Sequence, residues 1–296
     1  MKNEFLAQLS GATKRFDKIV ALDQINLQVR PGELLAVLGP NGAGKTTAIS
    51  LLLGLHQPDS GTAQLFGRSP ELVETRRRVG VMMQEVTLAT ELRVREHVAL
   101  VSSYYPNPLP LDAVIKMTGT TELASRFYGK LSGGQKRQAQ FAMAVCGRPR
   151  LLFLDEPTAG LDIQARQTMW ATLRDLIAQG VSIVLTTHYL EEAEALADRL
   201  AVLARGRVIA SGTLSEIRGL VSRKKITCTT ALSPEQLALW PGVETAIRDR
   251  DRVQITASDA EDVVRRLLAA DSTLHQLEVR SAGLAEAFSE LTQEAA

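Results

Sequence analysis

The chain has 296 residues, 45% of them hydrophobic, which is enough for one large domain and a smaller companion. Its 34 basic and 33 acidic residues leave a formal net charge of +1, which argues against a global electrostatic footprint for nucleic acid or anionic lipid. Cys146 and Cys228 are too few for a disulfide framework or a zinc site, so we expect reduced thiols in a cytosolic protein. No segment approaches the roughly 20 apolar residues that a membrane span requires.

The first two thirds of the chain predict an α/β fold. Residues 1–30, which end before the Pro31-Gly32 turn, predict antiparallel strands. Three apolar runs then precede helical patterns: "ELLAVLG" before "KTTAISLLLGL", "RLLFLDE" before "IQARQTMWATLRDLIAQG", and "SIVLTTH" before "YLEEAEALADR". Such alternation indicates a mostly parallel sheet covered by helices. "LAVLARGRVIASG", which turns at Arg205-Gly206, predicts a further antiparallel pair, so we expect an added antiparallel layer.

Two segments depart from this alternation. Between about residues 86 and 147 the strand signal disappears, and "LRVREHVALVSSYY" and "GQKRQAQFAMAVC" predict a helical insertion. After about residue 220 the pattern becomes β-α-β-β-α-β with a final helix, which predicts a small α+β ferredoxin-like domain whose hairpin turns at Asp249 to Asp251. We therefore expect two domains, residues 1–219 and 220–296.

The stretch "GPNGAGKTT" fits the pattern G-x-x-x-x-G-K-[ST] and lies between an expected strand and an expected helix. In this motif the glycines let backbone amides wrap phosphates, Lys45 reaches the β and γ oxygens, and the Thr46 hydroxyl binds Mg²⁺. The sequence therefore predicts a P-loop for a nucleoside triphosphate. The residues expected to contact it are Gly39, Asn41, Gly42, Gly44, Lys45, Thr46 and Thr47.

The run "LLFLDE" ends a buried strand with two carboxylates. Asp155 suits a Mg²⁺ role near a P-loop. Successive strand residues point to opposite faces, so Glu156 should instead approach an attacking water. The alternative is that one of these acids only caps the following helix.

Three further side chains are weaker candidates. Gln84 follows an expected core strand, and its amide could orient water or touch the metal. His188 closes "SIVLTTH" at the carboxyl end of a strand, where α/β sheets hold ligands, and we favour a γ-phosphate contact over a structural role. Phe16 is as compatible with a half-buried strand aromatic as with a stacking residue.

The stretch "LSGGQ" offers the amides of Gly133 and Gly134 at an expected helix start, which is a second phosphate-binding arrangement beside the P-loop. "AGLD" at residues 159–162 is by itself an ordinary turn with Asp162 as a helix cap. A chain with one P-loop thus carries two phosphate-binding arrangements.

With "GPNGAGKTT", "LSGGQ", "LLFLDEPTAGLD" and "TTH" in this order, the chain resembles the ATP-binding cassette (ABC) ATPases over roughly residues 4–220. The resemblance implies that two domains pair head to tail, so that each ATP lies between one P-loop and the partner's signature. It also implies roles for individual residues: Ser132, Gly133, Gly134 and Gln135 as the signature, Gln84 as the Q-loop glutamine, Glu156 as the catalytic base, Asp162 as the D-loop acid, His188 as the switch histidine and Phe16 as the adenine-stacking residue.

The sequence departs from the family pattern at two positions. Ile163 and Met83 stand where prolines are frequent, but neither change removes a reactive group, so an active ATPase is expected. The end of the cassette and the short tail resemble the ATPase subunits of bacterial ABC-2-type exporters. The resemblance implies ATP and Mg²⁺ as ligands and, as partners, a second ATPase domain, giving a homodimer, and a separate transmembrane permease, with no nucleic acid. It also implies a cytoplasmic location on the inner face of the membrane.

Two alternatives remain open. A soluble cassette ATPase acting on ribosomes or DNA would need a second cassette or a long coiled-coil insertion, and neither is evident in the sequence. An importer ATPase with a regulatory C-terminal domain is the other, although the tail shows no group of polar residues that suggests a pocket.

Overall fold

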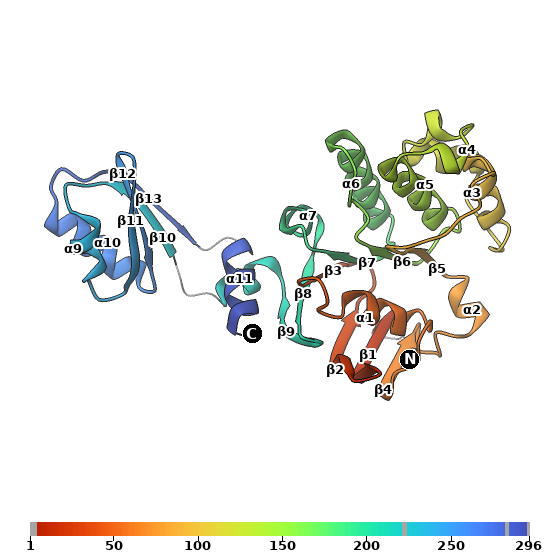
Figure 1. Cartoon of the computed structure of the whole chain (residues 1–296), viewed down its shortest axis with the longest axis horizontal. Helices are drawn as coiled ribbons and strands as arrows, with labels where there is room; N and C mark the ends of the chain where they lie inside the picture. The colour runs from red at the N-terminus through yellow and green to blue at the C-terminus, as the bar shows by residue number, and fades with distance from the viewer. Residues whose placement is uncertain (1–4, 221–223, 282–283, 295–296) are drawn as a thin grey trace. The chain divides into compact units, whose positions relative to one another are not determined.

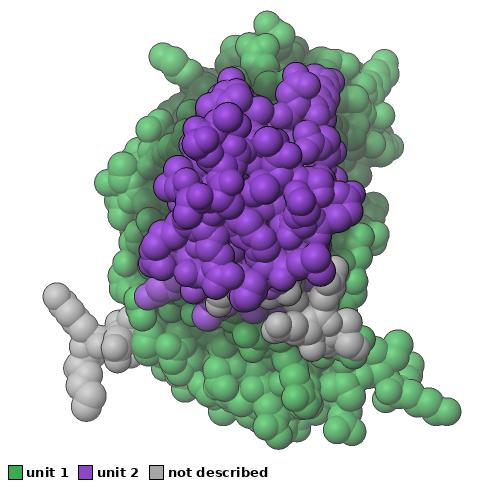
Figure 2. Space-filling model, turned by 90° about the vertical axis from the view of Figure 1, so that its left-hand side faces the viewer, with its two compact units in different colours: residues 1–213, 295–296 green, residues 214–294 purple. Residues whose placement is uncertain are grey.

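The computed structural model describes residues 5–220, 224–281 and 284–294. These residues form two compact units that divide between Thr213 and Leu214. Figure 2 colours the two units separately. The division lies before helix α8 (Leu214–Gly219), whereas the sequence placed the boundary after it.

A six-stranded sheet forms the centre of the first unit (Figure 1). Its order is β5-β6-β7-β3-β8-β9, and all neighbouring pairs are parallel except β8 and β9. Both faces are covered, which is why β3 and β6 read as unbroken apolar runs and are buried at every residue. The strands are β3 (Leu34–Leu38), β5 (Val79–Met82), β6 (Leu151–Asp155), β7 (Ser182–Thr187), β8 (Arg199–Ala204) and β9 (Arg207–Gly212).

A second, antiparallel sheet of order β2-β1-β4 confirms the predicted antiparallel layer. It consists of β1 (Ala7–Phe16), β2 (Ile19–Val29) and β4 (Ser60–Leu65). Helix α1 (Lys45–Leu52) contacts both β1 and the central strand β6. One continuous apolar core therefore joins the two sheets through α1.

Helices account for the segment between β5 and β6, as predicted. They are α3 (Val94–Ser102), α4 (Leu111–Met117), the short 3-10 turns η1 (Thr121–Leu123) and η2 (Tyr128–Lys130), and α5 (Gly133–Val145). The remaining helices of the first unit are α2 (Val73–Arg76), α6 (Ile163–Ala178) and α7 (Leu190–Leu196). Figure 1 shows α1 on one face of the six-stranded sheet and α5 and α6 on the other.

The second unit has the element order that the sequence predicts: β10 (Lys224–Thr229), α9 (Pro234–Ala238), β11 (Val243–Asp249), β12 (Arg252–Ala257), α10 (Ala260–Ala270), β13 (His275–Ser281) and α11 (Leu284–Glu294). Its four strands form an antiparallel sheet of order β11-β12-β10-β13 around a separate apolar core. The predicted hairpin turn is confirmed, because β11 ends at Asp249 and β12 begins at Arg252. Arg250 between them has a positive φ of 54°. No described helix of either unit has the length and apolarity needed to cross a membrane.

Candidate active site at the carboxyl ends of the parallel strands

The loop between β3 and α1 has a backbone path that only glycine accepts at key points. Gly44 has a φ of 103°, and a Cβ atom there would lie 2.6 Å from the Ala21 carbonyl oxygen. A Cβ atom on Gly39 would lie 2.5 Å from the Leu203 carbonyl oxygen. Both distances are shorter than a carbon and an oxygen can approach without displacement, so the fold itself requires glycine at positions 39 and 44.

Lys45 begins α1 and turns its side chain back over this loop. Its Nζ donates hydrogen bonds to the carbonyl oxygens of Gly39 at 2.7 Å and Pro40 at 3.1 Å. Burial lowers the pKa of Lys45, and the nearby carboxylates of Glu156 and Asp155 oppose that shift by favouring the charged amine. The site thus holds a buried ammonium group at the mouth of the loop, as phosphate binding requires.

The Asp155 carboxylate is fully buried at the end of β6 and joins two elements. Its Oδ2 accepts a hydrogen bond of 2.8 Å from the Thr46 hydroxyl of α1, and its Oδ1 accepts one from the Thr186 hydroxyl of β7. Among the described residues no group of three or more His, Cys, Asp or Glu could hold a metal ion. The Thr46 and Asp155 oxygens nevertheless fit Mg²⁺, which takes few protein ligands and completes its shell with phosphate and water oxygens.

Glu156 directs its carboxylate to different partners. Its Oε1 lies 3.1 Å from Nδ1 of His188 and 3.9 Å from Nζ of Lys45. The sequence argument relied on strand alternation, and this reason is wrong because β6 ends at Asp155. A left-handed conformation of Glu156, with φ at 48°, separates the two carboxylates instead.

The signature segment starts α5 and is closed by its own side chains. The Ser132 hydroxyl accepts a hydrogen bond from the Gln135 amide at 3.3 Å, and the Gln135 side chain accepts one from the Ser132 amide at 3.1 Å, which forms a capping box. Gly134 is packed, since a Cβ atom there would lie 2.7 Å from the Gly160 carbonyl oxygen. A Cβ atom on Gly133 would meet nothing within 4 Å, so the fold of this chain does not require glycine there.

The other predicted residues lie apart from this hydrogen-bonded group. Gln84 is exposed beyond the end of β5, and Asn41 is exposed in the loop before α1. Thr47 is half-buried within α1. Asp162 caps α6 through a 2.8 Å bond from the Ala165 amide. Phe16, 40% exposed at the end of β1, meets the His56 ring edge-on at 5.3 Å between centroids. The structure thus gathers Lys45, Thr46, Asp155, Glu156 and His188 at one place.

Two residues of this neighbourhood escaped the sequence analysis. Thr186 binds both the Asp155 carboxylate and the Glu156 amide, and its only signal was the polar end of an apolar strand. Arg137 of α5 donates hydrogen bonds to the carbonyl oxygens of Asp155 at the end of β6, of Glu156 after it, and of Met83 after β5. An arginine in a helix is ordinarily assigned to the surface, so the sequence held no signal for its buried position.

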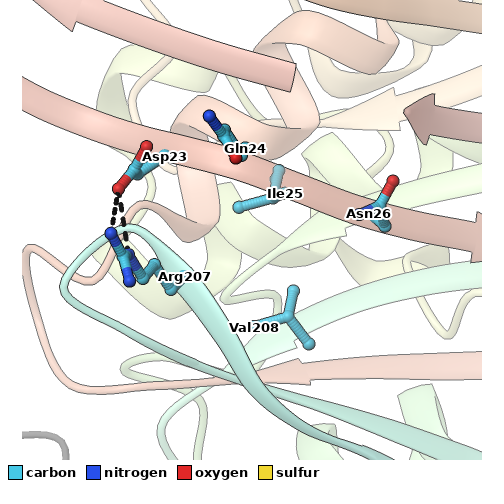
Figure 3. Close-up of a pocket in the computed structure, with 6 residues that line it drawn as sticks. All are labelled: Asp23, Gln24, Ile25, Asn26, Arg207 and Val208. Atoms are coloured by element: carbon cyan, nitrogen blue, oxygen red, sulfur yellow. Dashed lines mark hydrogen bonds and ion pairs between the residues drawn. The ribbon is translucent and has the colours of Figure 1, made fainter. Parts of the chain in front are cut away.

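A pocket of about 410 Å³ lies elsewhere, between β2 and β9. Figure 3 shows the Arg207 guanidinium against the Asp23 carboxylate, with a separation of 2.5 Å. The remaining lining residues are Gln24, Ile25, Asn26 and Val208, and none belongs to the predicted site. The chemistry expected from the motifs therefore belongs to the strand ends and not to this pocket.

Comparison with known proteins identifies relatives of this chain. The sequence model of the ABC transporter family matches residues 22–159. A "Nod factor export ATP-binding protein I" from Burkholderia thailandensis is 42% identical over 206 residues, which cover 67% of this chain and 68% of that protein. A structure titled as the ATP binding subunit of an ABC transporter has a TM-score of 0.67 and 29% identity, covering 73% of this chain and 92% of that chain.

A second solved structure shows an ATP-binding cassette in a dimeric, post-hydrolysis state bound to ADP and Pi. Its TM-score is 0.65 at 25% identity, and the match covers 70% of this chain and 98% of that chain.

Proposed function

This chain belongs to the ABC transporter ATP-binding proteins and is an ATPase subunit that binds ATP and supports transport; on that premise we propose how it works. Two copies bind head to tail, and each ATP lies between the P-loop of one copy and residues 132–135 of the other. The observation that carries this proposal is Gly133. Its missing side chain is not required within the chain, and it stands exposed at the amino end of α5, where amides favour an anion.

Within each site the residues divide the work. Lys45 and the loop amides bind the β and γ phosphates, and Thr46 and Asp155 hold Mg²⁺, which would neutralise charge on the phosphate oxygens. The Glu156 carboxylate accepts a proton from the water that attacks the γ-phosphorus, and ADP and inorganic phosphate are released. His188, which binds Glu156, contacts the γ-phosphate. Gln84 and Asp162 act at the edges of the same site, and Phe16 stacks on the adenine.

The partner that uses this energy is a separate transmembrane permease, and the transport direction is export. Two similar proteins support this proposal by their names. One is the ATP binding subunit of an ABC transporter, and the other is an export ATP-binding protein. The segment near residues 85–105, which follows Gln84 and includes α3, docks on the permease, so the chain works at the inner face of the membrane. The dimer closes because ATP binds its closed form more tightly, and it reopens after hydrolysis. This cycle of closing and reopening moves the permease.

We also propose that the chain has two domains. Residues 1–219 are the cassette with its helical subdomain at about 86–147, and residues 220–296 are a small ferredoxin-like domain. The strand order β11-β12-β10-β13 with two helices between strands supports a split βαβ arrangement.

Dimer formation is tested by light scattering on Glu156→Gln, which should accumulate the closed form. We expect twice the mass of one chain with ATP and Mg²⁺, and one chain mass with ADP. The matched control is Glu156→Gln combined with Lys45→Ala, which should stay monomeric with ATP. A monomer in every condition would contradict the shared site.

A further inference from the structure

Arg137 is a buried arginine of the first unit that the proposed chemistry does not use. It lies on the second turn of α5, with 8% of its surface exposed. Burial lowers its pKa, while the nearby Asp155 and Glu156 carboxylates favour the charged form. Within the described residues no carboxylate lies within ion-pair distance of its guanidinium. Backbone carbonyls therefore take most of its hydrogen bonds.

Those carbonyls belong to the two loops that carry candidate catalytic side chains. Nη2 donates to the Glu156 carbonyl oxygen at 2.9 Å and to that of Asp155 at 3.4 Å. Nη1 donates to the Met83 carbonyl oxygen at 2.8 Å, and Met83 immediately precedes Gln84. Because a guanidinium is planar and rigid, one side chain fixes these two loops relative to each other.

The conformation of Glu156 explains why such a clamp matters. A positive φ is unfavourable for a glutamate, and it persists only where the surroundings hold the backbone. On one side the Glu156 amide donates to the Thr186 carbonyl oxygen at 3.0 Å. On the other side Arg137 binds the Glu156 carbonyl. The direction of the Glu156 carboxylate, toward His188 and Lys45, thus depends on both contacts.

Arg137 also makes a side-chain hydrogen bond within its own helix. Gln140, one turn further along α5, accepts from Nη1 at 3.3 Å and donates to the Tyr128 hydroxyl at 2.9 Å. In the part of the protein that the structure describes, the Tyr128 hydroxyl bonds Gln140 and makes no hydrogen bond to the segments of Glu156 and Met83. Its hydroxyl can therefore be removed without touching the contacts to Glu156 and Met83.

We propose that Arg137 is a positioning residue for hydrolysis: its guanidinium holds the strained Glu156 backbone and the Met83 carbonyl in one fixed arrangement, so that the carboxylate of Glu156 and the loop of Gln84 keep their places together. This inference rests on the proposed role of Glu156 as the base. Arg137 itself touches neither nucleotide nor water.

The test compares Arg137→Lys with the control Tyr128→Phe by steady-state ATP hydrolysis. Lysine keeps the charge but cannot span both carbonyls, so kcat should fall about 10- to 100-fold, because small misplacements of a reacting group have effects of this size. The KM for ATP should change less than about threefold, since the phosphate contacts of Lys45 are untouched. Tyr128→Phe should keep kcat within about twofold. If Arg137→Lys keeps the wild-type kcat, or if KM rises in proportion as kcat falls, the inference is wrong.

Single-turnover rates with Arg137→Lys on a Glu156→Gln background separate positioning from general damage. If Arg137 acts through Glu156, the double variant should be no slower than Glu156→Gln alone. A further fall of tenfold would show that Arg137 does not act through Glu156 and would overturn the inference. Wild-type turnover by Glu156→Gln would remove the base assignment and the inference with it, whereas an inactive Glu156→Gln beside a fully active Arg137→Lys would remove the inference alone.

Discussion

Two places in the first unit present backbone amides at the start of a helix, and they are built differently. The loop before α1 is tied to buried charges of the same chain: Lys45 lies over its carbonyls and Thr46 binds Asp155. The start of α5 has its polar side chains, Ser132 and Gln135, already paired with each other, and Gly133 faces open space. The loop before α1 has a buried lysine and the two oxygens proposed to hold Mg²⁺, whereas at the start of α5 the nearby cation is the exposed Arg126, which donates a 3.2 Å hydrogen bond to Gln135.

This difference suggests what each place is for. A phosphate needs cationic and metal ligands to be activated, and the loop before α1 combines Lys45 with the Thr46–Asp155 pair. The open glycine at α5 is suited to a ligand that arrives already bound elsewhere. Changes at the two places should therefore have separable effects, with binding and chemistry lost at the first and chemistry alone lost at the second.

Glu156→Gln should have the largest effect on hydrolysis among the changes that leave ATP binding intact. The substitution keeps the size of the side chain and removes the charge that accepts a proton, so turnover should fall by roughly 10² to 10⁴. ATP should still bind, because Lys45 and the loop amides remain. Phosphate release measures the first quantity and equilibrium titration the second. Hydrolysis at the wild-type rate would mean that Glu156 has been misassigned.

Lys45→Ala should abolish hydrolysis and also weaken ATP binding by about tenfold or more, which corresponds to roughly 1.4 kcal/mol or more. The reason is the loss of the buried ammonium group from the phosphate loop. The matched control is Lys116→Ala, which removes an exposed lysine from α4. Equal ATP affinity of wild type and Lys45→Ala by titration calorimetry would contradict the phosphate role.

Gly133→Asp tests the proposed phosphate contact at the start of α5. Since a Cβ atom meets nothing there, the variant should fold and a single chain should bind ATP with wild-type affinity. Hydrolysis should fall at least about tenfold, because a carboxylate would face the phosphates of the partner's ATP. Undiminished turnover would show that the start of α5 takes no part in the reaction.

Gly134→Ala should lower the stability of the fold, and this is the smallest effect expected among these changes. A Cβ atom at 2.7 Å from the Gly160 carbonyl oxygen forces a shift that costs about 1–3 kcal/mol. The melting temperature should drop by about 2–4 °C per kcal/mol for a unit of this size. Gly133→Ala is the matched control and should melt with wild type. Equal melting of both variants would refute the packing difference between the neighbouring glycines.

The sequence predicts the features that depend on local pattern. Buried parallel strands read as apolar runs, so β3, β6 and β7 and the polar residues at their ends are found together with their motifs. The element order of the second unit follows from its change of periodicity.

Features that depend on distant backbone are not predicted. The partners of Arg137 lie 54 and 19 residues away and are carbonyl groups, which have no side-chain signature. The left-handed Glu156 and the mostly exposed strand β4, at the edge of the sheet beside β1, were likewise beyond a local pattern.

The shared site is tested most directly by a pair of introduced cysteines, Ser132→Cys and Asn41→Cys, on the Glu156→Gln background. Both positions are exposed, and the native Cys146 and Cys228 are buried, so they can remain in place. With ATP and Mg²⁺, mild oxidation or a short bifunctional thiol reagent should link two chains, and a covalent dimer should appear on a non-reducing gel. Each single-cysteine variant should give no such product, and reagents of increasing length allow for Cα separations beyond the roughly 7 Å that a disulfide tolerates. An ATP-dependent link within one chain, with no dimer at any reagent length, would contradict the proposal that one nucleotide is held by two copies.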